Sequence, residues 1–353
     1  MDIKQPSQLI NDNLIVKHYA GSIAYGTNLP TSDKDFRGVF VADPVNIRTP
    51  FYRIDEAKDT SEEDTIIYEL NQFMRLALDC NPNVVESLWV DESDIVFCTP
   101  AYTHLRSFAP QLLSAKMAFT TSGYATAQLK RIKGHHKWIN NPQPINQPRQ
   151  VDFLSLVHNF TPKKLFKIDM NDFHRGYRLV PYSLDTFGIY EVGGYETFNM
   201  DSGNLNTLYE DDNNTLGTPL FLVKFNKSEY NNTKDRWTNY WKWKRDRNVT
   251  RGELEEKFGF DCKHAMHLVR LLRIGEEVLT TGEYRVKRPD AQELLDIRSG
   301  KWTYQQLIEY AEDKDKHIRE VLYKQTCLPK VANKKLAAKL IMEIQDMVWN
   351  NGK

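Results

Sequence analysis

The 353-residue chain has few cysteines, no excess of charge of one sign and no long apolar stretch, and each shortage excludes a class of protein. Its four cysteines are far apart and form no C-x-x-C pair, so neither a disulfide framework nor a zinc knuckle is indicated. Forty-seven basic residues balance 47 acidic ones, which excludes a uniformly basic nucleic-acid coat protein. Any contact with nucleic acid must therefore come from a local patch.

The apolar segments are also short. No run approaches the roughly 18 residues that a membrane-spanning helix needs. The first residues, Met-Asp-Ile-Lys-Gln, lack the basic and apolar regions of a signal peptide. We therefore expect a cytoplasmic protein without a membrane partner, whose length suggests about two domains.

The hydrophobic patterns predict a mixture of strands and helices. In the first part of the chain we expect strands at 14–21, 36–42 and 64–70, and helices at 71–78 and 115–139. The pattern over 84–98 does not separate strand from helix. A proline-rich break follows the helix expected at 115–139, and Pro142, Pro144 and Pro148 mark a boundary there.

The remainder of the chain divides into a β-like middle and a helical end. In the middle we expect short strands at 178–181, 188–192 and 220–225, and a loop at Asp211–Thr215. The last third is helical by period and ends with a helix over 333–349. The expected domains are therefore 1–140, 141–250 and 251–353.

The segment that carries chemistry runs from Gly21 to Gly38 and reads Gly-Ser-Ile-Ala-Tyr-Gly-Thr, then Ser-Asp-Lys-Asp-Phe-Arg-Gly. Gly21 and Ser22 end a strand and open a turn whose backbone N–H groups and hydroxyl suit a phosphate. Asp33 and Asp35 leave the same face of a strand, where two carboxylates repel each other unless a cation lies between them. Mg²⁺ takes carboxylate oxygens and keeps positions open for phosphate and water. The segment therefore predicts nucleotidyl transfer.

These motifs resemble the polymerase-beta-like nucleotidyltransferase superfamily, and more closely its RNA-ligase-associated branch from bacteria and phages. The likeness extends over about 20–310, is weakest across 150–250, and includes four later blocks: Phe73–Glu86, Tyr124–Trp138, Lys263–Arg273 and Arg288–Gly300. The resemblance implies an α+β fold, with a mixed-sheet nucleotidyltransferase core and a helical C-terminal domain.

The resemblance also implies a mechanism. Two Mg²⁺ ions, held by Asp33, Asp35 and a third acid, would aim an acceptor hydroxyl at the α-phosphate of an NTP, ATP being the expected one, and steady the leaving pyrophosphate. The expected nucleotide-binding residues are Gly21, Ser22, Thr27, Ser32, His264 and His267. Lys263, Arg270 and Arg273 lie on the same helix as the two histidines and could also face the triphosphate.

Glu69 is the expected third acid. If the strands at 36–42 and 64–70 pair in antiparallel fashion, Glu69 lies beside the two aspartates, whereas Asp64 lies about 16 Å away. Glu86 is a rival, and Asp64 comes third. His264 and His267 are three apart on one helix face and could bind a metal, but no third ligand follows them in the sequence.

Two basic and aromatic stretches, Lys130–Trp138 and Arg236–Arg247, bear on the acceptor. They could stack on bases and bind phosphates, or form amphipathic helices whose tryptophans pack inward. Together with the RNA-ligase association they make an RNA 3′ end, such as that of a tRNA, the expected acceptor. Two alternatives stay open: transfer of AMP to a protein hydroxyl, as in antitoxin-type nucleotidyltransferases, and a nucleotide- or RNA-binding module without turnover. The oligomeric state cannot be read from the sequence.

Overall fold

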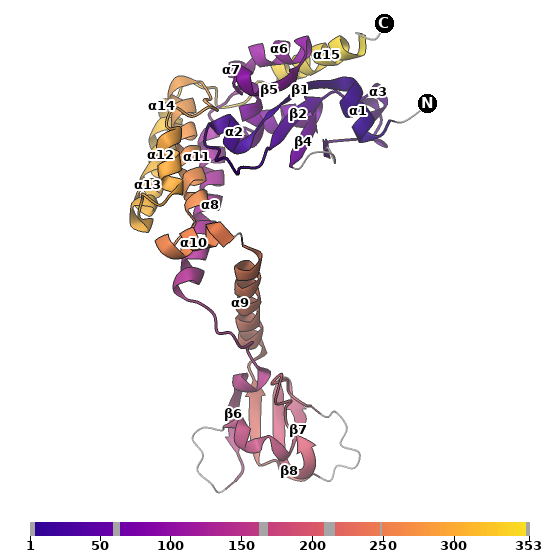
Figure 1. Ribbon diagram of the computed structural model, residues 1–353. Coiled ribbons are helices and arrows are strands. Elements are labelled where there is room, and N and C mark those ends of the chain that lie inside the picture. The colour runs from indigo at the N-terminus through magenta and orange to yellow at the C-terminus, as the bar shows by residue number, and fades with distance from the viewer. Residues whose placement is uncertain (1–3, 59–63, 162–168, 208–215, 248, 351–353) are drawn as a thin grey trace. The chain divides into compact units, whose positions relative to one another are not determined.

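The computed structural model describes residues 4–58, 64–161, 169–207, 216–247 and 249–350. The chain forms two compact units, which are drawn in Figure 1: unit 1 comprises Met1–Ile139 and Thr250–Lys353, and unit 2 comprises Asn140–Val249. The limits of unit 2 lie within one residue of the expected middle domain. The expected C-terminal domain, however, joins the first part of the chain in unit 1. The loop expected at Asp211–Thr215 lies outside the described residues.

Unit 1 contains a mixed sheet of five strands in the order β3-β4-β2-β1-β5. Their bounds are β1 Leu14–Tyr19, β2 Phe36–Phe40, β3 Glu56–Lys58, β4 Thr65–Glu69 and β5 Ile95–Cys98. β1 is antiparallel to both β2 and β5, whereas β2 and β4 are parallel. The expected mixed sheet is confirmed, but the expected antiparallel pairing of the second and third strands is wrong.

Helices cover both faces of this sheet. On one face lie α4 (Leu70–Leu78), α6 (Pro100–Ser107) and α15 (Lys334–Asn350). α15 presents Ala337, Leu340 and Ile344 to the core, three residues at the spacing of one helix face. Figure 1 shows α15, in yellow, alongside α6. On the other face, α1 (Pro6–Asn13) packs Leu9 and Ile10 into a smaller cluster with residues of β2 and β4.

Short helices connect these elements. They are α2 (Gly21–Tyr25), α3 (Pro44–Arg48), α5 (Pro82–Val85) and α7 (Ala109–Leu112). The undecided segment 84–98 holds the end of α5, two 3₁₀ turns (Glu86–Leu88 and Glu92–Asp94) and β5.

The second core of unit 1 is helical. Its elements are α8 (Met117–Asn140), α10 (Val249–Phe258), α11 (Cys262–Thr281), α12 (Ala291–Arg298), α13 (Tyr304–His317), a π-turn at Ile318–Leu322 and α14 (Tyr323–Gln325). This core includes Ala24, Tyr25 and Val85 from the first part of the chain. Residues on both sides of unit 2 in the sequence therefore share one interior within unit 1.

Unit 2 is built on an antiparallel sheet of four strands in the order β6-β9-β8-β7. Its elements are β6 (Leu154–Asn159), β7 (Arg175–Ser183), β8 (Thr186–Glu196), β9 (Phe221–Phe225), 3₁₀ turns at Gln150–Phe153 and Met170–Phe173, and α9 (Lys227–Asp246). Its core includes one buried residue from each of three strands: Leu179 of β7, Ile189 of β8 and Phe221 of β9. The sequence pattern located three of these strands but made β7 and β8 too short.

Candidate active site

The glycine–serine bend and the second aspartate of the motif are in contact. β1 and β2 pair Tyr19 with Phe36, and the ladder continues as Ala20 N donates a hydrogen bond to Asp35 O over 2.8 Å. Gly21 has φ +60°, and a Cβ added there would lie 2.2 Å from Asp35 Oδ2. Only glycine combines this backbone conformation with room for the carboxylate. The position therefore needs glycine for a reason that involves Asp35 directly.

Asp64 faces the same end of the sheet. Because β2 and β4 are parallel and pair Phe36 with Thr65, Asp35 and Asp64 occupy matching positions just before the two strands. Asp33 and Asp64 line one pocket of about 570 Å³. Asp64 has φ +54°, a conformation that is costly for a residue other than glycine and that recurs at functional sites. Its carbonyl accepts a hydrogen bond of 2.9 Å from Arg37 Nη1.

The electrostatics of Asp35 link these groups. Burial raises the pKa of Asp35 most, and the positive charge of Arg37 opposes this rise. The charge of Asp64 raises the pKa further, and smaller contributions come from Lys263, which lowers it, and Asp33, which raises it. A carboxylate disfavoured by burial and by two neighbouring acids is a suitable ligand for a hard divalent cation. Among the described residues, Asp33, Asp35 and Asp64 do not come within 4.8 Å of one another as a set.

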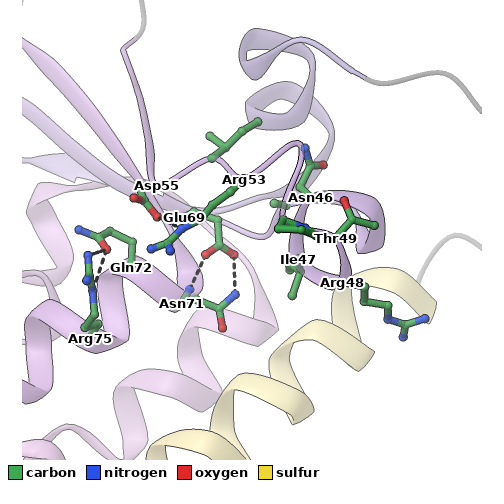
Figure 2. A pocket seen from close by; sticks show the side chains of 13 residues that line it. Asn46, Ile47, Arg48, Thr49, Arg53, Asp55, Glu69, Asn71, Gln72 and Arg75 are labelled. Atoms are coloured by element: carbon green, nitrogen blue, oxygen red, sulfur yellow. Dashed lines mark hydrogen bonds and ion pairs between the residues drawn. The ribbon is translucent and has the colours of Figure 1, made fainter.

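Glu69 does not lie beside Asp35, so the position expected for this acid is wrong. In the parallel register Glu69 pairs with Phe40, so it lies five residues along the strand from Asp35, or about 16 Å. Glu69 lines another pocket, of about 590 Å³, and its Oε2 accepts a hydrogen bond of 2.7 Å from Asn71 N, which caps α4. Figure 2 shows Glu69 directed at Asn71. Burial raises the pKa of Glu69, and the hydrogen bonds from Asn71 oppose that rise. Because β4 runs parallel to β2, Asp64 lies at the end of the sheet near Asp35, where Glu69 was expected, and Glu69 lies at the far end.

Glu86, the rival third acid, lies beneath α2. It is 4% exposed, and Tyr25 Oη donates to its carboxylate, with Oη to oxygen distances of 2.8 and 3.1 Å. The guanidinium of Arg270 lies over the ring of Tyr25, 3.6 Å from its centroid. Burial raises the pKa of Glu86 to about 7, although Arg270 and the hydrogen bond from Tyr25 lower it. Glu86 and Arg270 therefore hold Tyr25, the last residue of the helix that Gly21 opens.

Two further expected nucleotide-binding residues shape the loop between the bend and the aspartates. Thr27 is fully buried, and its backbone N–H donates to Ser22 O over 2.9 Å. Ser32 Oγ accepts a hydrogen bond of 2.9 Å from Leu29 N. Both contacts close turns that lead from Ser22 to Asp33. In the structure, Thr27 and Ser32 therefore help to fix the geometry of this loop.

The polar residues expected on α11 have different surroundings. His264 Nε2 lies 3.6 Å from Asp261 Oδ2, and Arg273 forms ion pairs with Asp290 and Glu293. Burial lowers the pKa of His267 to about 3, with smaller contributions from Arg270 and Lys263. Lys263, in the first turn of α11, is exposed, and its charge acts on Asp35. The sequence predicted Lys263, Arg270 and Arg273 as residues that could face the triphosphate. Of these three, Lys263 is the one whose charge lowers the pKa of Asp35.

Some side chains of the two basic and aromatic stretches have partners within the protein, while most of their lysines and arginines are exposed. In the first, on α8, Lys133 pairs with Glu312 at 3.3 Å, and His136 Nδ1 lies 2.7 Å from Gly259 O. In the second, on α9, the indole N–H groups of Trp237 and Trp241 both donate to Pro144 O, over 2.9 and 3.0 Å. These contacts favour the packing interpretation for the tryptophans of α9.

Comparison with known proteins agrees with this geometry. Residues 4–141 match the model of the RNA repair pathway DNA polymerase beta family. The match covers the sheet of unit 1 and the whole segment from Gly21 to Gly38, and it confirms the resemblance to polymerase-beta-like nucleotidyltransferases and their fold. No curated protein and no solved structure gives a significant match. Among the described helices, none has the length and apolar character needed to cross a membrane.

Proposed function

We propose that this protein, whose residues 4–141 match the model of the RNA repair pathway DNA polymerase beta family, transfers a nucleoside monophosphate from an NTP to the 3′-hydroxyl of an RNA. The observation that carries the proposal is the contact between Asp35 and Gly21, because it joins a phosphate-binding bend to an acid group that includes Asp33 and Asp64. The RNA acceptor is supported by the repair pathway in the description of the matching family.

Asp33, Asp35 and Asp64 are the residues that would hold divalent cations, and their all-carboxylate donor set fits Mg²⁺. Bound there, two such ions would offset the charge of the triphosphate and of the departing pyrophosphate. Asp64 replaces Glu69 in this set because of the parallel register of β2 and β4.

The other residues of the site position the nucleotide. The turn at Gly21 and Ser22 offers backbone N–H groups and a hydroxyl to the triphosphate. Lys263 brings a positive charge to the same end of the sheet from a segment far along the chain. The buried contacts of Tyr25 with Glu86 and Arg270 fix the direction of α2 and hence of the bend.

The reaction is a displacement at phosphorus. The acceptor oxygen forms a bond to the α-phosphorus, and the bond from that phosphorus to the bridging oxygen of pyrophosphate breaks. The proton of the acceptor hydroxyl passes to a carboxylate of the group formed by Asp33, Asp35 and Asp64. The protein contributes placement and charge neutralisation and forms no covalent intermediate.

The test is transfer of label from α-phosphate-labelled ATP, and from the other NTPs in turn, to RNA ending in a 3′-hydroxyl. We expect labelled RNA and released pyrophosphate with the wild type, no transfer with Asp35→Asn, and wild-type transfer with Asp313→Asn, which changes an exposed aspartate on α13. RNA ending in a 3′-phosphate is the matched acceptor control. Label that follows protein in a denaturing gel would favour transfer to a protein hydroxyl, and NTP binding without release of pyrophosphate would favour a binding module.

A further inference from the structure

A second group of ligand-type side chains gathers at the start of α11. His135 on α8, Glu255 on α10 and Asp261 before α11 each offer one atom to a set whose members all lie within 4.8 Å of one another. Both acids are buried, with Glu255 2% and Asp261 0% exposed. All three segments belong to unit 1, and α8, α10 and α11 are labelled in Figure 1.

Asp261 occupies the centre of the group. Its Oδ1 accepts a hydrogen bond of 3.0 Å from His264 N and caps α11. Its Oδ2 lies 3.4 Å from His135 Nδ1 and 3.6 Å from His264 Nε2. His135 Nδ1 is in turn 4.0 Å from Glu255 Oε1. One oxygen of Asp261 therefore fixes the helix, while the other faces two imidazoles.

The separations within this group are longer than direct hydrogen bonds and are compatible with a shared ion. Hydrogen bonds from nitrogen to oxygen are about 2.7–3.2 Å long. Ligands placed tetrahedrally at the usual zinc distances of about 2.0–2.1 Å stand about 3.3–3.4 Å apart. Asp261 Oδ2 stands near that distance from both imidazoles, at 3.4 and 3.6 Å, whereas Glu255 Oε1 is 4.0 Å from His135 Nδ1, so side chains would have to move to complete a tetrahedral site.

We propose that His135, Glu255, Asp261 and His264 form a binding site for a divalent transition-metal ion of the Zn²⁺ type. Two imidazoles and two carboxylates are a donor set that favours Zn²⁺ over Mg²⁺, so the ion differs from the one proposed for the aspartates. The sequence showed only His264 and His267 at metal spacing; the fold supplies His264 with partners from other helices instead.

The position of the site suggests what the ion does. His135 is near the end of α8, just before the chain enters unit 2, and Glu255 lies on α10, just after the chain leaves it. An ion held by both would join the two segments of unit 1 that flank unit 2. It would also fix the first turn of α11, which carries Lys263.

The experiment uses the full-length protein after removal of metal with a chelator. We expect one equivalent of Zn²⁺ to bind in a calorimetric titration carried out in excess Mg²⁺, and Co²⁺ to give the visible absorption of a four-coordinate site. His135→Gln and Glu255→Gln should each weaken Zn²⁺ binding by at least about tenfold. The matched control is His317→Gln, which changes an exposed histidine on α13 and should bind like the wild type.

Two outcomes would overturn the proposal: wild-type protein that binds no Zn²⁺ or Co²⁺, and variants that bind both as tightly as the wild type. Circular dichroism shows whether each variant is folded; if one is not, His264→Gln, at a partly exposed position, takes its place. Asp35→Asn should keep full Zn²⁺ binding. Absence of RNA labelling by the wild-type protein, with Zn²⁺ binding intact, would therefore count against the proposed function alone.

Discussion

Replacing Gly21 with alanine tests the arrangement on which the proposed active site depends. The new Cβ would lie 2.2 Å from Asp35 Oδ2, so the carboxylate oxygen must retreat by more than about 1 Å to reach an ordinary contact distance. The atom that must move is the end of a side chain, which makes the displacement cheap for folding. For catalysis, by contrast, a misplacement of about 1 Å can cost about 100-fold in rate.

The protein supplies a matched control in Gly26, which ends the same short helix. Gly26 also has a left-handed backbone, with φ +70°, but a Cβ added there would meet nothing closer than Ala291 Cβ at 3.8 Å. Both alanine variants therefore bear the same backbone strain, about 1–2 kcal/mol of folding stability. Only the variant at Gly21 moves the carboxylate of Asp35.

The assays are urea unfolding and transfer of label from NTP to RNA. We expect Gly21→Ala and Gly26→Ala to lose similar stability, and only Gly21→Ala to lose about 100-fold or more of its activity. Equal activity in the two variants would refute the reasoning, because Asp35 would then have no need of its present position. A Gly21→Ala protein that fails to unfold cooperatively would show instead that the bend is mainly structural.

Three further tests separate the remaining roles. Glu69→Ala should lower the free energy of unfolding by about 1 kcal/mol through loss of the cap on α4 and leave activity within about twofold, whereas Asp64→Asn should remove activity; the reverse pattern in the transfer assay would restore Glu69 as the third acid. Because burial raises the pKa of Glu86 to about 7, the folded protein binds its proton more tightly than the unfolded chain does, so stability should fall by about 3 kcal/mol between pH 5 and pH 8 and be regained on acidification. Glu86→Gln should flatten this part of the pH profile in urea unfolding, and an unchanged slope would argue against a buried ionisable Glu86. Lys263→Met should raise KM for the NTP by about tenfold, Lys263→Arg should restore it, and an unchanged KM in the methionine variant would remove Lys263 from the nucleotide site.

The parts of the site that the sequence predicted are those set by neighbouring residues. Gly21 and Asp35 are brought together by a single antiparallel pairing between β1 and β2, which follow each other in the chain. The third acid depends on the direction of β4, which no local pattern specifies. A parallel pair needs a connection of a dozen residues or more, and the segment between β2 and β4 is long enough to supply one. The length of that connection was therefore the one sequence feature that could have indicated a parallel β4 and hence a position for Asp64 near Asp35.

The groups that support the site come from segments whose meeting no motif announces. Tyr25, Glu86 and Arg270 each look ordinary in their own segment, yet they form one buried contact beneath the bend. Arg270 and Lys263 lie on α11, well beyond residues 4–141 that match the family. The same helix begins at Asp261, the centre of the proposed metal site. α11 therefore connects three features of unit 1: its first turn carries Lys263, its middle supports Tyr25, and its N-cap, Asp261, is one of the proposed metal ligands. Variation on this helix should therefore affect nucleotide binding while the glycine–serine bend and the aspartates stay unchanged.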